Sequence, residues 1–144
     1  MDKKQMSEED IKLRFITPAL LEKGKWSKEQ VRMNVYFTDG KIMIAGKTVK
    51  RGKRNFADYI LQYKSNKPLA VIEAKDNNHS VGEGMQQALE YAEKLDLSFV
   101  FTSNGDGFVF HDRESGKEIN LSLSQFPSPQ ELWEKYKKYR GITE

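Results

Sequence analysis

Three residues on two neighbouring apolar segments carry the chemistry that this sequence predicts: Asp58, Glu73 and Lys75. If Ser65 and Asn66 form the two-residue loop of a β-hairpin, Asp58 lies directly opposite Glu73 on the adjacent strand. Two opposed carboxylates on buried strands repel each other, so this arrangement requires a cation or a raised pKa. Alternation along a strand puts Lys75 on the same face as Glu73. The spacing therefore predicts a site where two carboxylates and one ammonium group converge.

Oxygen ligands of this kind favour Mg²⁺, with Mn²⁺ as an alternative ion. Mg²⁺ commonly takes one or two carboxylates, and waters and a substrate phosphate complete its shell. Such an ion would polarise a scissile phosphate, while Lys75 orients the attacking water or stabilises the developing charge. A purely structural role also fits this short pattern, with Asp58 and Glu73 flanking the strands and Lys75 neutralising one of them. The spacing alone leaves both interpretations open.

The composition restricts the other chemistry that the chain can support. It contains no Cys and two His, which argues against thiolate zinc sites and thiol nucleophiles and leaves oxygen ligands for any catalytic metal. A length of 144 residues is that of one ordinary domain with a single core. No apolar run approaches the length of a membrane helix, and the N-terminus lacks the features of a signal peptide. We therefore expect a cytoplasmic protein without a membrane partner.

Positive charge is concentrated in one short segment before Asp58. The formal net charge is only +3, but basic residues crowd the stretch from 47 to 54, where they would favour contact with a phosphate backbone. A solvated basic loop fits the same pattern, so charge alone does not decide between the two interpretations. The candidate DNA-binding side chains are Lys50, Arg51, Lys53 and Arg54.

A possible phosphate-binding loop for ATP fails on spacing. Gly40 and Gly46, which precedes Lys47 and Thr48, are separated by five residues, whereas the motif requires four. The residues that follow also lack a helical pattern with an apolar stripe. We therefore expect no ATP binding by this domain.

The hydrophobic pattern predicts an α/β fold around the site. Apolar residues recur with helical spacing in some segments and in short strand-like runs in others. The run before Lys75 is apolar enough for a central strand that is covered on both faces. We therefore expect a mixed central β-sheet flanked by helices. The expected strands are at 31–37, 41–44, 56–63, 68–75, 97–102 and 107–111. The expected helices are one from Ser7 to Gly24 with a kink at Pro18, one from Ser80 to Leu95, between the strands at 68–75 and 97–102, and a final one from Ser128.

Five sequence blocks follow one another along the chain: SEEDIKLRFITPALLEKGKW, RNFADYILQY, PLAVIEAK, SVGEGMQQALEYAEKL and FVFTSNGDGFVFHD. In their order and approximate spacing they resemble the N-terminus of type I restriction enzyme R subunits, whose nuclease module belongs to the PD-(D/E)xK superfamily. The resemblance implies a restriction-endonuclease-like core and a Mg²⁺-dependent endonuclease that cleaves double-stranded DNA. One departure is Ala57, where the superfamily usually has proline, but a metal needs only the carboxylate that follows. The resemblance extends over about residues 7 to 139, which is nearly the whole chain.

The resemblance also implies roles for individual residues. Gln87 and Tyr91 match a glutamine and a tyrosine that support the site in these subunits, and Glu8 appears at the place of a glutamate in the first helix. Gln87 and Tyr91 share one helical face, for which ordinary helix surface and packing is an alternative explanation. The implied catalytic residues are Asp58, Glu73 and Lys75, and the implied metal ligands are Asp58, Glu73 and the backbone carbonyl of Ala74.

By the same resemblance, the chain is a single nuclease domain from a longer protein. R subunits carry a helicase-like motor that uses ATP, and the expected helix at 128–144 resembles the lead-in to that motor. The implied partners are double-stranded DNA, the motor domain of the parent chain, and the modification and specificity subunits of a type I complex. The alternative is a nuclease-like module that binds DNA or couples subunits without cutting by itself.

Overall fold

The computed structural model describes residues 2–38, 41–42 and 55–142. Within these ranges seven strands form one sheet in the order β2-β1-β3-β4-β5-β6-β7. Neighbouring strands are antiparallel except β4 and β5, which are parallel, so the expected mixed sheet is confirmed. The strands are β1 (Val31–Thr38), β2 (Lys41–Ile42), β3 (Asn55–Gln62), β4 (Pro68–Ala74), β5 (Phe99–Ser103), β6 (Phe108–Asp112) and β7 (Glu118–Leu121).

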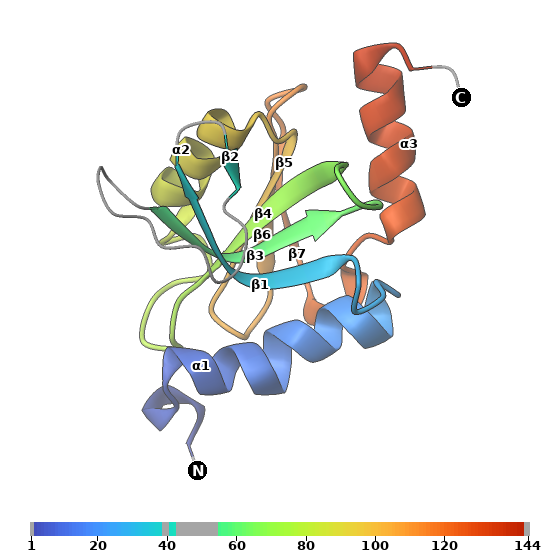
Figure 1. The fold of residues 1–144 in the computed structure, drawn as a ribbon. Coiled ribbons are helices and arrows are strands. Elements are labelled where there is room, and N and C mark those ends of the chain that lie inside the picture. The colour runs from blue at the N-terminus through green and yellow to red at the C-terminus, as the bar shows by residue number, and fades with distance from the viewer. Residues whose placement is uncertain (1, 39–40, 43–54, 143–144) are drawn as a thin grey trace.

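Helices cover both faces of the sheet and define two cores (Figure 1). On one face pack residues 8–23, hereafter the N-terminal helical segment, and α3 (Pro129–Arg140), and on the other packs α2 (Met85–Leu95). No helix in the described ranges is long and apolar enough to cross a membrane. The helical elements are η1 (Lys3–Gln5), α1 (Glu8–Ile11), η2 (Lys12–Ile16), η3 (Ala19–Lys23), α2 (Met85–Leu95), η4 (Leu123–Gln125) and α3 (Pro129–Arg140).

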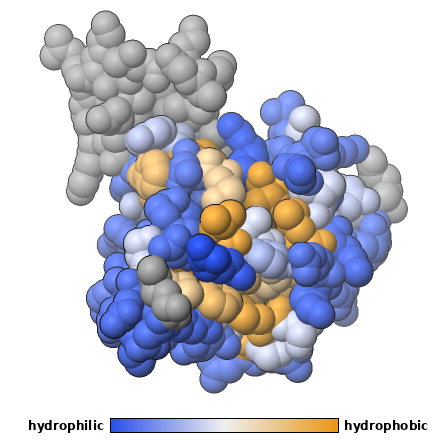
Figure 2. All heavy atoms as spheres, turned by 90° about the horizontal axis from the view of Figure 1, so that it is seen from below, coloured by the Kyte–Doolittle hydropathy of each residue, from blue (hydrophilic) through white to orange (hydrophobic). Residues whose placement is uncertain are grey.

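The N-terminal helical segment begins where the sequence predicts. The Ser7 hydroxyl accepts a hydrogen bond from the Asp10 N–H at 3.1 Å, which caps the first turn. The turns then widen in η2 and η3, where the Gly24 N–H bonds to the Ala19 carbonyl, five residues back. Pro18 lies between these two wide turns, where its missing N–H interrupts the α-helical ladder. Figure 2 shows the molecule from below the view of Figure 1, where the N-terminal helical segment lies. Apolar residues gather near the centre of this view, and hydrophilic residues surround them.

The hairpin of β3 and β4 has the register that the sequence predicts where it matters for the site. Tyr59 pairs with Ile72 in the antiparallel ladder. Continuing this ladder by one residue places Asp58 opposite Glu73. The hairpin therefore brings the two carboxylates to the end of a strand pair whose neighbouring residues are buried.

The helix that the sequence places at Ser80 in fact begins later, at Met85. The Glu83 carboxylate accepts a hydrogen bond from the Ser80 N–H at 3.4 Å and lies 2.7 Å from the His79 imidazole. The capping pattern thus closes a turn instead of starting the helix, because glycines at 82 and 84 disfavour helical backbone. This turn brings the backbone of Gly84 close to the end of β4.

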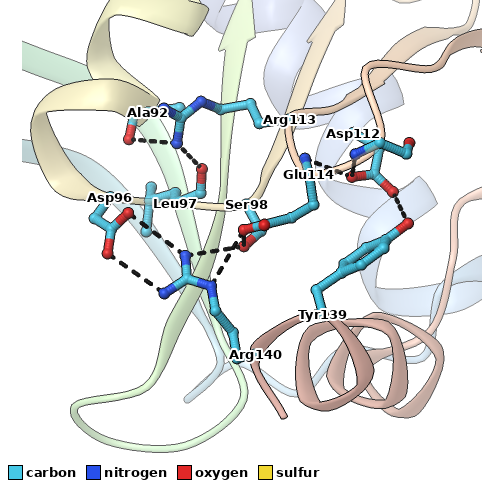
Figure 3. Close-up of polar contacts among 10 residues, drawn as sticks. Ala92, Asp96, Leu97, Ser98, Asp112, Arg113, Glu114, Tyr139 and Arg140 are labelled. Atoms are coloured by element: carbon cyan, nitrogen blue, oxygen red, sulfur yellow. Dashed lines mark hydrogen bonds and ion pairs between the residues drawn. The ribbon is translucent and has the colours of Figure 1, made fainter.

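The C-terminal helix α3 is fastened to the rest of the fold by polar contacts at its last turn (Figure 3). The Arg140 guanidinium contacts Asp96 at 3.4 Å and Glu114 at 3.1 Å. The Tyr139 hydroxyl donates to Asp112 Oδ2 at 2.7 Å. The helix start at Ser128 is confirmed, with the Ser128 hydroxyl and the backbone of Glu131 forming the expected capping box.

Candidate active site

Asp58 in the middle of β3 and Glu73 near the end of β4, hereafter the carboxylate pair, link the two strands by reciprocal hydrogen bonds. The Asp58 N–H donates to Glu73 Oε2 at 3.0 Å, and the Ala74 N–H donates to Asp58 Oδ2 at 2.8 Å. Each carboxylate therefore accepts from the backbone of the opposite strand, which fixes its orientation. Both residues are buried, with 6% of Asp58 and 5% of Glu73 exposed. Two acidic groups are thus held side by side in the interior.

Burial and mutual repulsion disfavour the state in which both carboxylates of the pair are ionised. Burial raises the pKa of Glu73 to about 8, and the neighbouring Asp58 charge acts in the same direction. In the absence of a metal ion, the neutral form of Glu73 is therefore favoured at neutral pH. A divalent cation beside both carboxylates would favour the ionised form of Glu73.

Lys75 lies beside Glu73, as strand alternation predicts. A Cβ placed on Gly84 would lie 3.5 Å from Lys75 Cε and 3.8 Å from Glu73 Cβ, so both side chains pass the same point of the backbone. The Lys75 charge also lowers the pKa of Glu73. The Lys75 N–H donates to the Ser103 carbonyl at 2.9 Å, which continues the ladder with β5. Lys75 is half-buried, so part of its side chain is in contact with solvent.

Glu8 reaches the same site from the first turn of α1. Burial raises the pKa of Glu8, the Asp58 charge raises it further, and the charges of Lys12 and Lys75 lower it. These interactions put the Glu8 carboxylate within electrostatic reach of the carboxylate pair. The adjacent Glu9 is exposed and forms an ion pair with Lys12 at 3.0 Å. The structure thus distinguishes the two glutamates: Glu8 interacts with the carboxylate pair, and Glu9 pairs with Lys12.

Gln87 and Tyr91 lie one turn apart on α2 and differ in their surroundings. Tyr91 is buried and packs edge-on against Phe37, with ring centroids 5.0 Å apart. Burial raises the pKa of Tyr91, and the Glu73 charge raises it further, so its hydroxyl lies near the carboxylate pair. Gln87 is exposed, and none of the hydrogen bonds found among the described residues joins it to the carboxylates. Of the two, the structure brings only Tyr91 to the pair.

Lys12 is a site residue that the sequence pattern did not identify. Its side chain is 1% exposed, and its Nζ lies 3.0 Å from Glu9 Oε1, 2.9 Å from Asn34 Oδ1 and 3.4 Å from Asp58 Oδ1. A signal was present in the sequence, because Lys12 precedes Ile16 by four residues and so falls on the apolar face of the helix. A lysine in that position is costly to bury unless it is paired.

The donor set fits a hard divalent cation such as Mg²⁺. In the part of the chain that the structure describes, no group of three or more His, Asp or Glu side chains is arranged to hold a metal ion. Asp58 and Glu73 supply two carboxylates, and the Ala74 carbonyl follows Glu73 directly in the chain. Because Mg²⁺ commonly keeps several waters and takes a substrate phosphate, two carboxylates are a sufficient protein contribution.

The basic segment before β3 lies outside the described residues. The predicted DNA-binding residues Lys50, Arg51, Lys53 and Arg54 belong to it, and their role stays a prediction. The segment ends directly before Asn55, the first residue of β3, and Asp58 follows three residues later. Any charge that it carries is therefore tethered within a few residues of the carboxylate pair.

Comparison with known proteins identifies the family. Residues 8–127 match the family model described as type I restriction enzyme R protein N terminus. The chain belongs to this family. It is 43% identical over 143 residues to the type I restriction enzyme EcoAI endonuclease subunit of Escherichia coli, an alignment that covers 96% of this chain and 18% of that protein.

A solved structure from the same family supports the fold. It is described as a fragment of an HsdR subunit of a type I restriction enzyme from Vibrio vulnificus, and it matches with a TM-score of 0.81 and 39% identity. The match covers 96% of this chain and 27% of that one. The chain thus corresponds to the N-terminal part of R subunits, and the resemblance seen in the sequence is confirmed at the level of family and fold.

Proposed function

We propose that this R-subunit N-terminal domain is a Mg²⁺-dependent endonuclease that hydrolyses phosphodiester bonds of double-stranded DNA. The observation that carries the proposal is the carboxylate pair, Asp58 and Glu73, held by reciprocal backbone hydrogen bonds with Lys75 beside it. Membership of the R-subunit family supports it, because the Escherichia coli relative is named an endonuclease subunit. The pattern of one aspartate followed by Glu-x-Lys is also that of the PD-(D/E)xK superfamily, which the sequence resembles.

In the proposed mechanism Asp58, Glu73 and the Ala74 carbonyl hold the ion. When bound, the ion supplies charge stabilisation to the scissile phosphate and lowers the pKa of a water molecule. The backbone hydrogen bonds to both carboxylates keep them in place, so little reorganisation is needed during the reaction. Lys75 orients the water or stabilises the negative charge that develops on the phosphate. Tyr91 forms a buried wall on the α2 side of the pair.

The proposal places the other activities of the enzyme outside this domain. The chain spans 18% of the Escherichia coli relative and 27% of the Vibrio vulnificus chain. The proposed partners are double-stranded DNA, the helicase-like motor of the parent chain, and the modification and specificity subunits. ATP would be used by the motor, and the DNA sequence would be recognised by the partner subunits.

Nicking and linearisation of supercoiled plasmid in Mg²⁺ or Mn²⁺ tests the proposal. Asp58→Asn is the informative variant, because the amide oxygen still accepts the Ala74 N–H while the charge is removed. We expect a loss of cutting of at least about 100-fold, the scale on which one preorganised charge acts in catalysis, and a similar loss in Lys75→Met. Asp96→Asn is the matched control, since that side chain is 79% exposed and lies at the far end of α2. The control should cut as the wild type does.

Thermal unfolding with and without Mn²⁺ separates the two ways in which cutting could fail. An ion that binds only the native state raises the melting temperature. If Mn²⁺ stabilises the wild type but not Asp58→Asn, and nothing is cut, the site binds metal and cleavage requires the motor and partner subunits. If Mn²⁺ neither stabilises the wild type nor supports cutting, the proposal fails and the chain is a binding or coupling module.

A further inference from the structure

The Lys12 ammonium group is surrounded by oxygens that come from three elements. Glu9 belongs to α1, Asn34 to β1 and Asp58 to β3, and each contributes one oxygen within 3.4 Å of Lys12 Nζ. Two carboxylates and an amide carbonyl are also the donors that a hard metal ion selects. The three oxygens therefore favour a positive charge at this position, and the Lys12 ammonium group supplies it.

Asn34 shows that this environment is built into the sheet. Its φ of 55° lies in the left-handed region, which asparagine tolerates better than most residues. Met33 pairs with Tyr59 and Val35 pairs with Ala57, so Asn34 lies opposite Asp58 and interrupts the ladder there. The unusual backbone aims an amide oxygen at Lys12.

The apolar side chains of β1 change face at the same point. Val31 packs against the core that contains the N-terminal helical segment, whereas Val35 and Phe37 belong to the core under α2. Alternation along an undisturbed strand would keep all three on one face. The left-handed backbone at Asn34 thus rearranges the strand locally. Such a conformation costs free energy and persists only where the surrounding contacts hold it in place.

The charges around the site match one divalent ion. With Glu73 ionised, as it would be beside a bound ion, four carboxylates and two ammonium groups interact here, which gives a formal charge of −2. A single divalent ion would neutralise this charge, and a second one would leave this group of side chains with a net positive charge. The groups are Glu8, Glu9, Asp58 and Glu73 with Lys12 and Lys75.

We infer that Lys12 is a fixed cation of this site, which orients Asp58 and takes the place of a second metal ion, so that the site binds one divalent ion. The inference rests on the proposed function, since it concerns the same metal site. Lys12 is a positioning residue: it holds Asp58 Oδ1, while the Ala74 N–H holds Oδ2. Both oxygens are then fixed before any ion arrives.

Calorimetric titration with Mn²⁺, together with the electron paramagnetic resonance signal of the free ion, tests the inference. The wild-type chain should bind one ion. Lys12→Met keeps the apolar stem and removes the charge, so it should bind a second ion and hold the first about tenfold more tightly, because a nearby repelling charge is gone. Lys12→Arg keeps the charge and should bind one ion.

Lys23→Met is the matched control for net charge. Lys23 is exposed and lies about 16 Å further along the same helical segment, given a rise of roughly 1.5 Å per residue. This variant should bind one ion with wild-type affinity. Circular dichroism of each variant establishes that it is folded before its binding is compared.

Each outcome bears on one statement. Two ions in the wild type would overturn the inference and leave the proposed function intact. A folded Lys12→Met that still binds only one ion would also overturn it, because the position of the Lys12 ammonium group would then take no second ion. If the wild type binds no Mn²⁺ at all, the proposed function itself fails. Should Lys12→Met not fold, the wild-type stoichiometry still decides the number of ions.

Discussion

Glu73 is the residue whose ionisation depends most visibly on the fold. Its pKa is about 8 in the folded chain without metal, against an ordinary value of 4.5. Between these values the folded state binds a proton that the unfolded state has released. Stability therefore falls as pH rises through this window, because the unfolded state binds fewer protons. The fold tolerates this cost at neutral pH, which is expected of a site that is completed by a cation.

Replacing Glu73 by Gln should remove this pH dependence. The amide is neutral at every pH and its oxygen can still accept the Asp58 N–H. In a metal chelator, the melting temperature of Glu73→Gln should therefore gain on that of the wild type as pH increases from about 5 to about 8. Glu90→Gln, at an exposed position of α2, should follow the wild-type curve. Parallel curves for Glu73→Gln and the wild type would mean that Glu73 is ionised in the metal-free protein.

The residues of the site differ in how well the sequence reveals them. Asp58 and Glu73 belong to one hairpin, so their spacing from the turn is enough to bring them together. Lys12 reaches Asp58 from a helix and Asn34 reaches Lys12 from another strand, and no local pattern relates such distant positions. A lysine on an apolar helix face, as Lys12 is, indicates that it has a buried partner, but the sequence does not identify that partner.

At the scale of elements, the β3–β4 hairpin shows how a correct prediction can hide two irregularities. Near the turn Gln62 pairs with Pro68, one residue away from the partner that a two-residue loop predicts, and Asn66 has a φ of 67°. A register shift next to Gln62 then restores the predicted alignment, so that Leu61 pairs with Ala70. The spacing in the sequence gives the net register, whereas compensating bulges depend on backbone conformations that spacing does not report.

The turn between β5 and β6 fixes the N-terminal helical segment against the sheet. Gly105 has a φ of 92°, and a Cβ there would lie 2.9 Å from Ile11 Cγ2. The Gly105 carbonyl also accepts a hydrogen bond from Lys3 Nζ at 2.8 Å. The turn thus needs glycine both for its backbone conformation and for the close approach of α1.

Gly105→Ala should therefore lower the free energy of unfolding by more than Gly116→Ala does. Gly116 also has a positive φ, 79°, but has nothing within 4 Å of an added Cβ. Strain at φ costs roughly 1–2 kcal/mol in both variants, and only Gly105→Ala adds a clash with Ile11 of roughly 1–3 kcal/mol. Urea unfolding of the two variants measures the difference. Equal losses would show that α1 can shift away from the turn at no cost.

At the scale of the whole molecule, the fold class follows from the sequence because the sheet is covered on both faces. Apolar runs in β4 and β5 give a clear central pattern, and both strands are buried. The edge strand β7 is not among the predicted elements, since it has only four residues and three of them are exposed. Edge strands depend on pairing with a neighbour, which a local pattern describes poorly.

The extent of the folded unit is also a property of the whole molecule. The family model ends at residue 127, but the core continues beyond it. Leu132 in α3 is fully buried, and the Trp133 ring stacks on that of Tyr63 with centroids 4.4 Å apart. The contacts of Tyr139 and Arg140 then hold the far end of α3 (Figure 3). Because its side chains pack in this core, α3 is part of the folded domain and does more than link it to the residues that follow.

A chain that ends at residue 127 should therefore be much less stable than one that ends at residue 142. Removing α3 uncovers the core around Tyr63, and Trp133→Ala alone should lower the free energy of unfolding by about 3–5 kcal/mol, as for other large-to-small changes in cores. Thermal and urea unfolding followed by circular dichroism compares the three proteins. If the chain ending at 127 unfolds at the same temperature as the longer one, α3 contributes nothing to this core. Its packing would then serve only to orient the chain that follows, and the boundary of the family model would also be that of the folded unit.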